Sequence, residues 1–255
     1  MFKTLKKHQF LLEELVKRDF KKKYKRSILG MGWSILSPLL MLLVMRLVFT
    51  QFFGRGVEHY TTYLFCGNLI FAYFNESATQ GMTSLMSNAS IFTKINVPKY
   101  LFLLSKNVQT LINFGLTLIV FFLFCIIDGI SFNFGFLMLL LPIICLVIFN
   151  MGVGMILSAM FVFFRDIQYL WTIFSQLLMY MSAIFYTVDG YPEWVQRIFY
   201  LNPIYVFITY FRRVVISGEI PSLYYHLWMI GYSALVALIG ALVYKKNNQK
   251  FLYYV

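Results

Sequence analysis

The chain has 255 residues, of which 60% are hydrophobic, 20% aromatic and only 13% charged, and its mean hydropathy is +0.72. Soluble domains carry about 25% charged residues, so this composition excludes an ordinary soluble enzyme, a disordered chain and a secreted disulfide scaffold. The net charge is +12, and most of it lies at the two ends of the sequence. Between the ends, apolar runs are long enough to cross a bilayer, which takes about 20 helical residues. The sequence therefore predicts an all-α integral membrane protein that binds no nucleic acid.

Residues 1–32 hold ten Lys and Arg residues and three acids. Apolar residues recur there at helical spacing on one face: Leu11, Leu12, Leu15, Val16 and Phe20. The opposite face is charged: Glu14, Lys17, Arg18, Lys21, Lys22 and Lys25. This pattern predicts an amphipathic helix in the cytoplasmic membrane interface, with its cations toward anionic lipid. The alternative, a plain basic cluster that fixes orientation, explains the charge but not the apolar stripe.

Residues 33–244 are predicted to form one six-span transmembrane domain. The spans are 33–53, 61–86, 108–127, 134–163, 168–187 and 223–244. Seventeen Lys and Arg residues fall on one side of this frame and four on the other. Because positively charged loops stay in the cytoplasm, both termini are predicted to be cytoplasmic. Residues 245–255 then form a basic cytoplasmic tail.

The second span carries a stripe of polar side chains. Asn68, Asn75 and Thr79 share one helical face, and Glu76 lies beside it. Ionisable residues within a membrane usually face the bundle interior or an aqueous route. The stripe therefore predicts either a transport path or hydrogen bonds between helices, and aromatic side chains nearby can stack on sugar rings. The candidate channel-lining residues are Tyr63, Asn68, Phe71, Phe74, Asn75, Glu76, Thr79, Tyr180 and Tyr186.

The connection 188–222 is long, apolar and aromatic. Pro192 and Asn202-Pro203 divide it into pieces too short to span a bilayer. Because open backbone is not tolerated in lipid, about 189–213 is predicted to re-enter the outer leaflet as short helices packed against protein. The alternative is a hairpin of two further spans, against which Pro203 argues. The candidate gate residues are Trp194, Asn202, Pro203, Arg212 and Arg213.

No motif for chemistry is found in the sequence. It contains no G-x-x-x-x-G-K-[ST] loop for ATP, its histidines are scattered, and no paired acids occupy one short segment. We therefore expect no catalytic residue, no metal site and no cofactor in this chain, and we expect a partner to supply the energy for any work.

Four motifs occur in order along the chain. They are Lys25-Arg26-Ser27-Ile28-Leu29-Gly30 with Trp33 and Pro38-Leu39, then Ile91-Phe92-Thr93-Lys94 with Pro98-Lys99, then Phe164-Arg165-Asp166, and finally Asn202-Pro203 with Arg212 and Gly218. Together they resemble permeases of the ABC-2 type, and most closely the branch that exports lipid-linked polysaccharides (O-antigen, capsule or teichoic acid). The sequence has Lys99 where this family often has Arg, and Ala183 where a proline is common.

The resemblance implies a permease that moves a polyprenyl pyrophosphate-linked glycan. It also implies a homodimer of this chain with two ATPase subunits, which bind ATP and Mg. A coupling helix at about 91–99 would contact the ATPase through Ile91, Phe92, Thr93, Lys94, Pro98 and Lys99. Since phosphate needs cations, a basic rim is predicted for the pyrophosphate: Lys25, Arg26, Arg46 and Arg165. For Arg165 a salt bridge with Asp166, or capping of the fourth span, is the favoured alternative.

Three other functions compete with this one. An exporter of a drug or small lipid would share the fold. A membrane-embedded transferase would need acid pairs that the sequence lacks, and a purely structural scaffold would leave Glu76 and the re-entrant pieces without a role.

Overall fold

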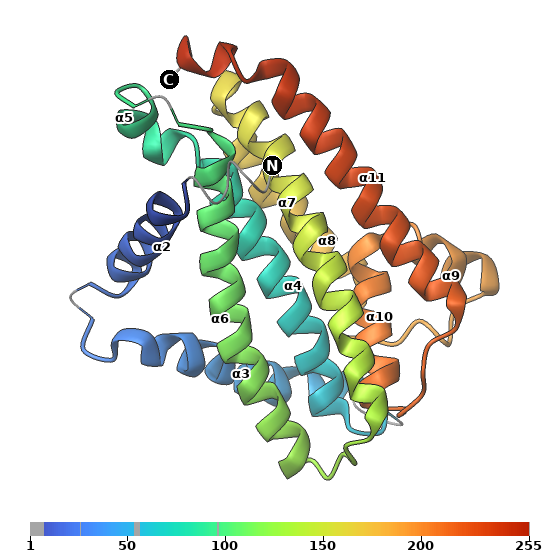
Figure 1. The fold of residues 1–255 in the computed structure, drawn as a ribbon. Coiled ribbons are helices and arrows are strands. Elements are labelled where there is room, and N and C mark those ends of the chain that lie inside the picture. Colours follow the sequence, from blue (N-terminus) through green and yellow to red (C-terminus); the bar gives the residue numbers. More distant parts are fainter. Residues whose placement is uncertain (1–7, 26, 54–56, 96, 255) are drawn as a thin grey trace.

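The computed structural model describes residues 8–25, 27–53, 57–95 and 97–254. These residues form helices and turns and contain no strand (Figure 1). The long helices are α2 (Gln9–Tyr24), α3 (Trp33–Phe53), α4 (Tyr60–Thr83), α6 (Tyr100–Ile127), α7 (Leu140–Phe163), α8 (Ile167–Met181) and α11 (Leu223–Asn247). The short ones are α5 (Ala89–Phe92), α9 (Glu193–Phe199), α10 (Pro203–Val215) and the 3₁₀ turns η1 (Gly30–Gly32), η2 (Met86–Asn88), η3 (Phe134–Leu139) and η4 (Lys250–Leu252).

Four stretches are long and apolar enough to cross a membrane: Gly30–Thr50, Tyr100–Ile127, Phe134–Phe163 and Leu223–Asn247. The prediction of an all-helical chain with membrane-spanning segments is therefore confirmed for these four. Helix α4 has 24 residues but carries the polar stripe, and α8 has only 15 residues. The six-span count stays a prediction that depends on α4 and α8.

Helix α8 ends at Met181, whereas the sequence predicted a helix to 187. Ala183 follows in the left-handed region, with φ of 48°, although no proline is present. Side chains from α10 and the residue before it bind the carbonyl groups there: Asn202 donates to the Met181 oxygen at 3.2 Å, and Arg212 to the Ala183 and Ile184 oxygens at 2.9 Å each. These distant donors replace helical amides as partners, so the helix stops early.

Helix α4 lies at the centre of the bundle. It packs against α3, α6, α7 and α10, while α7 packs along α11 (Figure 1). Its side chains Leu64, Phe65 and Ile70 are fully buried. Because lipid is as apolar as these side chains, helix association in a membrane depends on close packing rather than on the hydrophobic effect.

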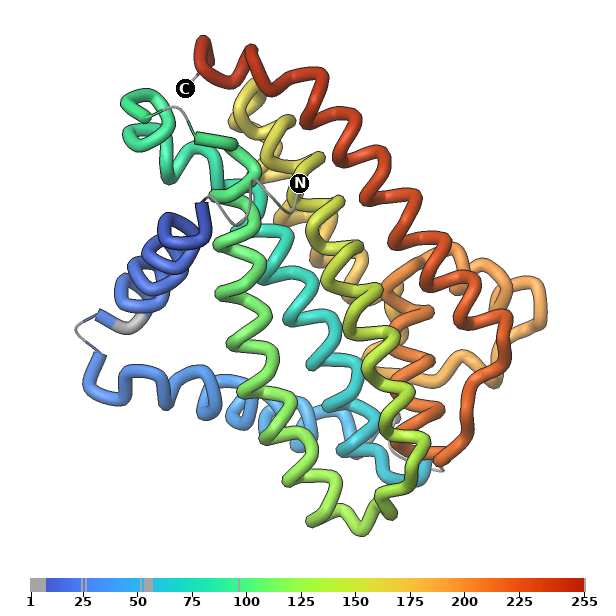
Figure 2. Tube along the Cα trace, in the orientation of Figure 1, coloured from blue at the N-terminus to red at the C-terminus, as the bar shows by residue number. Residues whose placement is uncertain are grey.

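Helix α5, η4 and the turn between α7 and α8 lie at one end of the bundle, and the connections between α6 and α7 and between α10 and α11 lie at the opposite end (Figure 2). At the first end, Leu15 of α2, Phe92 of α5 and Phe251 of η4 share one buried cluster. At the other end, His59 lies 3.2 Å from the Asp128 carboxylate, and Asn133 donates to the Gly218 oxygen. Helix α3 packs against α4 and α6 and crosses the bundle in this view (Figure 2).

Helices α7 and α11 approach most closely at two glycines. A Cβ atom on Gly240 would lie 2.5 Å from the Gly152 carbonyl oxygen, whereas one on Gly231, also in α11, would meet nothing within 4 Å. We therefore expect Gly240→Ala to lower the free energy of unfolding by about 1–3 kcal/mol through overpacking. Gly231→Ala should change it by less than about 1 kcal/mol. Thermal unfolding of both variants in detergent measures the difference, and equal midpoints would contradict this packing.

Candidate functional site

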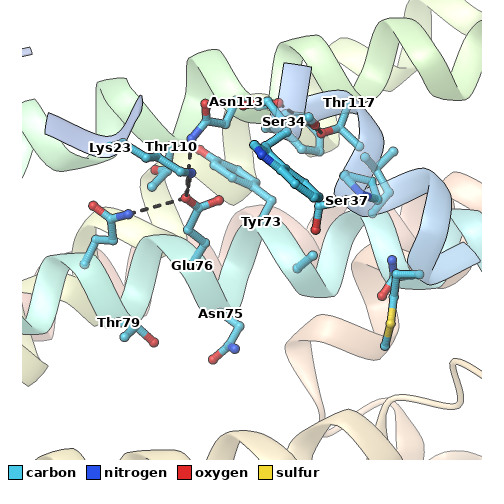
Figure 3. Close-up of a pocket in the computed structure, with 18 residues that line it drawn as sticks. Lys23, Ser34, Ser37, Tyr73, Asn75, Glu76, Thr79, Thr110, Asn113 and Thr117 are labelled. Carbon is cyan, nitrogen blue, oxygen red and sulfur yellow. Dashed lines mark hydrogen bonds and ion pairs between the residues drawn. The ribbon is translucent and has the colours of Figure 1, made fainter. Parts of the chain in front are cut away.

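A cavity of about 690 Å³ lies between α2, α3, α4 and α6 (Figure 3). Its polar lining comes from these residues: Lys23, Ser34, Ser37, Asn68, Asn75, Glu76, Thr79, Gln80, Thr110, Asn113 and Thr117. Its apolar lining comes from Trp33, Pro38, Met41, Leu69, Ala72, Tyr73 and Phe114. Hydroxyl and amide groups therefore predominate over charges, and three aromatic side chains contribute to the wall.

The Glu76 carboxylate joins side chains from three helices, α2, α4 and α6, in this cavity (Figure 3). Its Oε1 atom accepts from Lys23 Nζ of α2 at 2.6 Å, from Gln80 Nε2 of α4 at 3.3 Å and from Asn113 Nδ2 of α6 at 3.3 Å. The Glu76 and Lys23 side chains are 32% and 35% exposed. The acid that the sequence placed in a predicted span therefore has an ammonium partner, and the solvent can still reach this ion pair.

The structure brings together the polar half of the predicted channel lining but not the aromatic half. Asn68, Asn75, Glu76 and Thr79 all line the cavity. Phe71 and Phe74 are 6% and 2% exposed in the core and do not line this cavity. They lie on other faces of α4, where Phe74 packs against Phe149 of α7 and Trp171 of α8.

Three tyrosines of the predicted lining also lie elsewhere. Tyr63 donates to the Tyr186 carbonyl oxygen at 2.7 Å, and Tyr186 donates to the Tyr180 carbonyl oxygen at 2.8 Å. Tyr180 is 56% exposed on α8. The rings that do reach the cavity are Trp33, Tyr73 and Phe114.

The predicted basic rim does not gather at the cavity. Lys25 is exposed on a basic surface of α2, Arg46 is exposed on α3, and exposed Arg165 lies 5.3 Å from the centre of the Phe161 ring. Arg26 lies outside the described residues. The described cation that lines the cavity is Lys23. Helical spacing could have identified it, because Lys23 follows Phe20 and Val16 by three and seven residues and so continues the apolar stripe.

Helix α2 is held against α6 by polar contacts as well as by its apolar stripe. Buried Asp19 lies 2.9 Å from Lys106 Nζ and 2.7 Å from Arg18 Nη2, and Gln109 Nε2 donates to the Asp19 carbonyl oxygen. Leu15 is 3% exposed. The apolar stripe therefore faces protein in this structure, and the opposite face of α2 is a basic surface.

The predicted coupling residues divide into buried and exposed groups. Phe92 is 4% exposed and packs against Phe102. Lys99 is 8% exposed, and its ammonium donates to the Asn248 carbonyl oxygen between the Phe92 and Phe251 rings. Desolvation in this cluster lowers the pKa of Lys99. Phe92 and Lys99 thus join this segment to the end of the chain and present little surface to a partner.

The surface of that segment is formed by other residues. Thr93 and Lys94 are exposed, and Ile91 and Pro98 are half-buried. Ile95, which the sequence reasoning did not select, is a large apolar side chain that is 54% exposed. Asn96 lies outside the described residues. An exposed isoleucine beside a lysine is the feature of this surface that a protein partner could bury.

At the opposite end of the bundle, Arg212 is a buried attachment point. It is 7% exposed, lies 3.4 Å over the Tyr63 ring, and donates to the carbonyl oxygens of Tyr63, Ala183 and Ile184. A Cβ atom on Gly67 would lie 2.9 Å from Arg212 Nη2, so a glycine is required beside the guanidinium. Arg212 thereby ties α10 to α4 and to the turn that follows α8.

The other predicted gate residues have separate surroundings. Asn202 Oδ1 accepts from the Ile204 amide as an N-cap, and Pro203 occupies the first position of α10, where its missing N–H costs nothing. Arg213 lies 4.7 Å from the Tyr225 ring centre, and Trp194 is 67% exposed on α9.

The fold and the cavity define a helical membrane protein with a polar site between its helices. Residues 11–216 match the ABC-2 type transporter family, and the chain belongs to this family. The resemblance found in the four sequence motifs is thereby confirmed.

Curated relatives cover nearly the whole chain. The O-antigen export system permease protein RfbA of Klebsiella pneumoniae is 28% identical, over 94% of this chain and 93% of its own length. RfbA of Myxococcus xanthus is 23% identical over 98% and 97%. The capsule polysaccharide export inner-membrane protein CtrC of Neisseria meningitidis is 22% identical over 88% and 86%.

Removal of the Arg212 guanidinium should destabilise the fold. In Arg212→Met, three carbonyl groups in a buried environment lose their donors, each loss costing about 1–3 kcal/mol. We expect a fall in the free energy of unfolding on the order of 3 kcal/mol. The neighbouring Arg213→Met should cost less than about 1 kcal/mol, because that side chain is half-buried and stacks on one ring. Thermal unfolding in detergent, followed by tryptophan fluorescence, compares the two, and equal losses would contradict the buried role of Arg212.

Proposed function

We propose that this chain is the permease subunit of an ATP-driven exporter that moves a lipid-linked polysaccharide across the bacterial cytoplasmic membrane. The cargo class is that of an O-antigen, a capsule or a teichoic acid. The observation that carries the proposal is similarity, over 88% to 98% of the chain, to two O-antigen export permeases and to a capsule polysaccharide export protein. The same observation favours this function over export of a drug or small lipid.

The chemistry of the cavity supports a polyhydroxylated cargo. Sugar hydroxyls exchange hydrogen bonds with amide and hydroxyl side chains, which predominate in the lining. The ring of Trp33, which is 45% exposed, offers a flat apolar face at the same site.

The orientation in the membrane belongs to the proposal. Helices α3, α4, α6, α7, α8 and α11 span, and α9 and α10 re-enter from the outer side. Both termini lie in the cytoplasm, because Lys residues are concentrated at the end of the bundle that holds α2, α5 and η4. The buried surface of α10 supports its place inside the bundle rather than in lipid, since ten of its thirteen residues are buried.

The partners follow from the same family. Two copies of this chain assemble with two ATPase subunits, which bind ATP and Mg; this chain needs no cofactor of its own. The cargo, a polyprenyl pyrophosphate-linked glycan, approaches from the inner leaflet between α3 and α8.

The buried cluster at the cytoplasmic end gives a route from the ATPase to the cavity. A displacement of α5 moves Phe92, which shares this cluster with Leu15 of α2. Packed interiors transmit displacements because they have little free volume. Helix α2 carries Lys23 and hence the contact with Glu76. ATP binding in the partner can therefore alter the cavity through α5 and α2.

The docking of the ATPase can be tested at Ile95. We expect Ile95→Asp to abolish co-purification of the ATPase subunit, because a carboxylate cannot be buried in an apolar contact without a partner. The permease itself should fold, since Ile95 is 54% exposed. The matched control is Ile220→Asp, which places the same charge at a position 61% exposed, at the opposite end of the bundle. Equal co-purification with both variants would reject the assigned docking surface.

The cargo can be tested by deleting the gene. We expect the deletion strain to accumulate a glycan on its polyprenyl pyrophosphate carrier inside the cell, and expression of the intact chain should restore export. Lipid extraction with mass spectrometry of the carrier fraction provides the measurement. An unchanged carrier fraction together with raised sensitivity to an exported drug would instead assign the chain to the alternative class.

A further inference from the structure

We propose that Lys23 is a diphosphate-binding residue, and that it is paired with Glu76 until a diphosphate binds. In this structure its ammonium binds the Glu76 carboxylate, and on arrival of cargo it exchanges that partner for the diphosphate that joins the lipid to the glycan. The proposal rests on the proposed function and adds a specific residue and ligand group to it.

The position of Lys23 supports this role. It lies in the last turn of α2, at the cavity, and its Nζ atom is 2.6 Å from Glu76 Oε1 (Figure 3). Among the described residues that line the cavity, Lys23 is the one cation and Glu76 the one anion. A phosphate group that enters this cavity therefore finds its cationic partner at Lys23, and it must displace Glu76 to use it.

The exchange of partners by Lys23 costs little free energy, for Lys23 and for Glu76 alike. An ion pair that is about one-third exposed contributes little net free energy. When Lys23 leaves, Glu76 keeps the amide donors of Gln80 and Asn113, so its carboxylate is not stranded without hydrogen bonds. A diphosphate carries more negative charge and more acceptor oxygens than a carboxylate, and therefore competes well for the ammonium.

The surroundings favour a lipid as the source of the diphosphate. Met41 and Pro38 of α3 form an apolar part of the cavity wall, and Met41 is itself 48% exposed. Apolar residues along the same helix, Leu40, Leu43 and Leu47, are 47%, 55% and 70% exposed. A cation beside an exposed apolar helix suits a ligand with an anionic head and a hydrocarbon tail.

The link to α2 explains why such an exchange would matter. Helix α2 is bound to α6 through Asp19 and Lys106, one turn before Lys23, and to the cytoplasmic cluster through Leu15. Loss of the Lys23–Glu76 contact removes an ion pair between α2 and α4 at the cavity. Binding of a diphosphate would therefore change the contacts of α2, which is also the helix that α5 would displace in the proposed route from the ATPase.

Binding measurements on the full-length chain in lipid nanodiscs test the proposal. The probe is geranylgeranyl diphosphate, compared with geranylgeraniol and inorganic pyrophosphate, and the dissociation constant is measured by thermophoresis. We expect Lys23→Ala to weaken binding of the lipid diphosphate about tenfold and Lys23→Arg to retain it. Glu76→Gln should tighten binding severalfold, because it removes both the competing partner and the repulsion. Lys21→Ala, in the same helix but not at the cavity, should leave binding within about twofold of the wild type.

The decisive result is that Lys23→Ala and Glu76→Gln shift the dissociation constant in opposite directions. A purely structural ion pair would make Lys23→Ala and Glu76→Gln change binding in the same direction, and that result, or no change in either, would overturn the proposal. Equal binding of geranylgeraniol would overturn it too. Lys23-dependent binding of pyrophosphate as tight as that of the lipid diphosphate would support a diphosphate site but reject the lipid as its source.

The probes carry no sugar, so this result is independent of the cargo test. Opposite shifts without a trapped glycan in the deletion strain would retain the diphosphate site and reject the proposed cargo. A trapped glycan without opposite shifts would retain the cargo and reject the role of Lys23.

Discussion

The structure depends on one constraint: a helix with polar and ionisable side chains lies at the centre of an apolar bundle. Hydrocarbon offers no hydrogen bonds, so the polar groups of α4 must find partners inside the protein or at a wetted cavity. Lys23 and Asn113 reach Glu76 from neighbouring helices. Arg212 answers the same constraint at the other end, where it binds carbonyl groups left free by the early end of α8. The helices α2, α6 and α10 lie around α4 where their side chains can form these hydrogen bonds.

Distant segments of the chain converge at the end of the bundle that holds α5 and η4. The stripe of α2, the segment around α5 and the end of the chain share one buried cluster, to which Lys99 adds a contact with the Asn248 carbonyl group. The family motif that suggests a surface for the ATPase therefore also contains residues that hold this cluster together. Only part of the motif remains exposed, and Ile95 extends that part. In the proposed coupling role, the exposed part of the segment would contact the ATPase and the buried part would transfer the displacement inward.

Sequence reasoning succeeded where the cause is local. Hydropathy located α3 at 33–53, and the Asn202-Pro203 pair marked the start of α10, because an N-cap and a first-turn proline act within one helical turn. It failed where the cause is distant. The end of α8 at Met181 depends on donors about twenty and thirty residues later, and the burial of Phe74 depends on which face of α4 meets α7 and α8. No local pattern around those residues carries that information.

The sequence by itself determined that this is a basic, helical membrane protein of the ABC-2 type, because composition, apolar run length and ordered motifs are properties of the chain alone. It also identified the polar stripe with Glu76. Only the tertiary structure decided which cation meets that carboxylate. The predicted rim of Lys25, Arg46 and Arg165 is dispersed, and Lys23, one of several lysines in a basic run, lies at the cavity. The reason is physical: charge count is set by the sequence, but the distance between two charges is set by how helices pack.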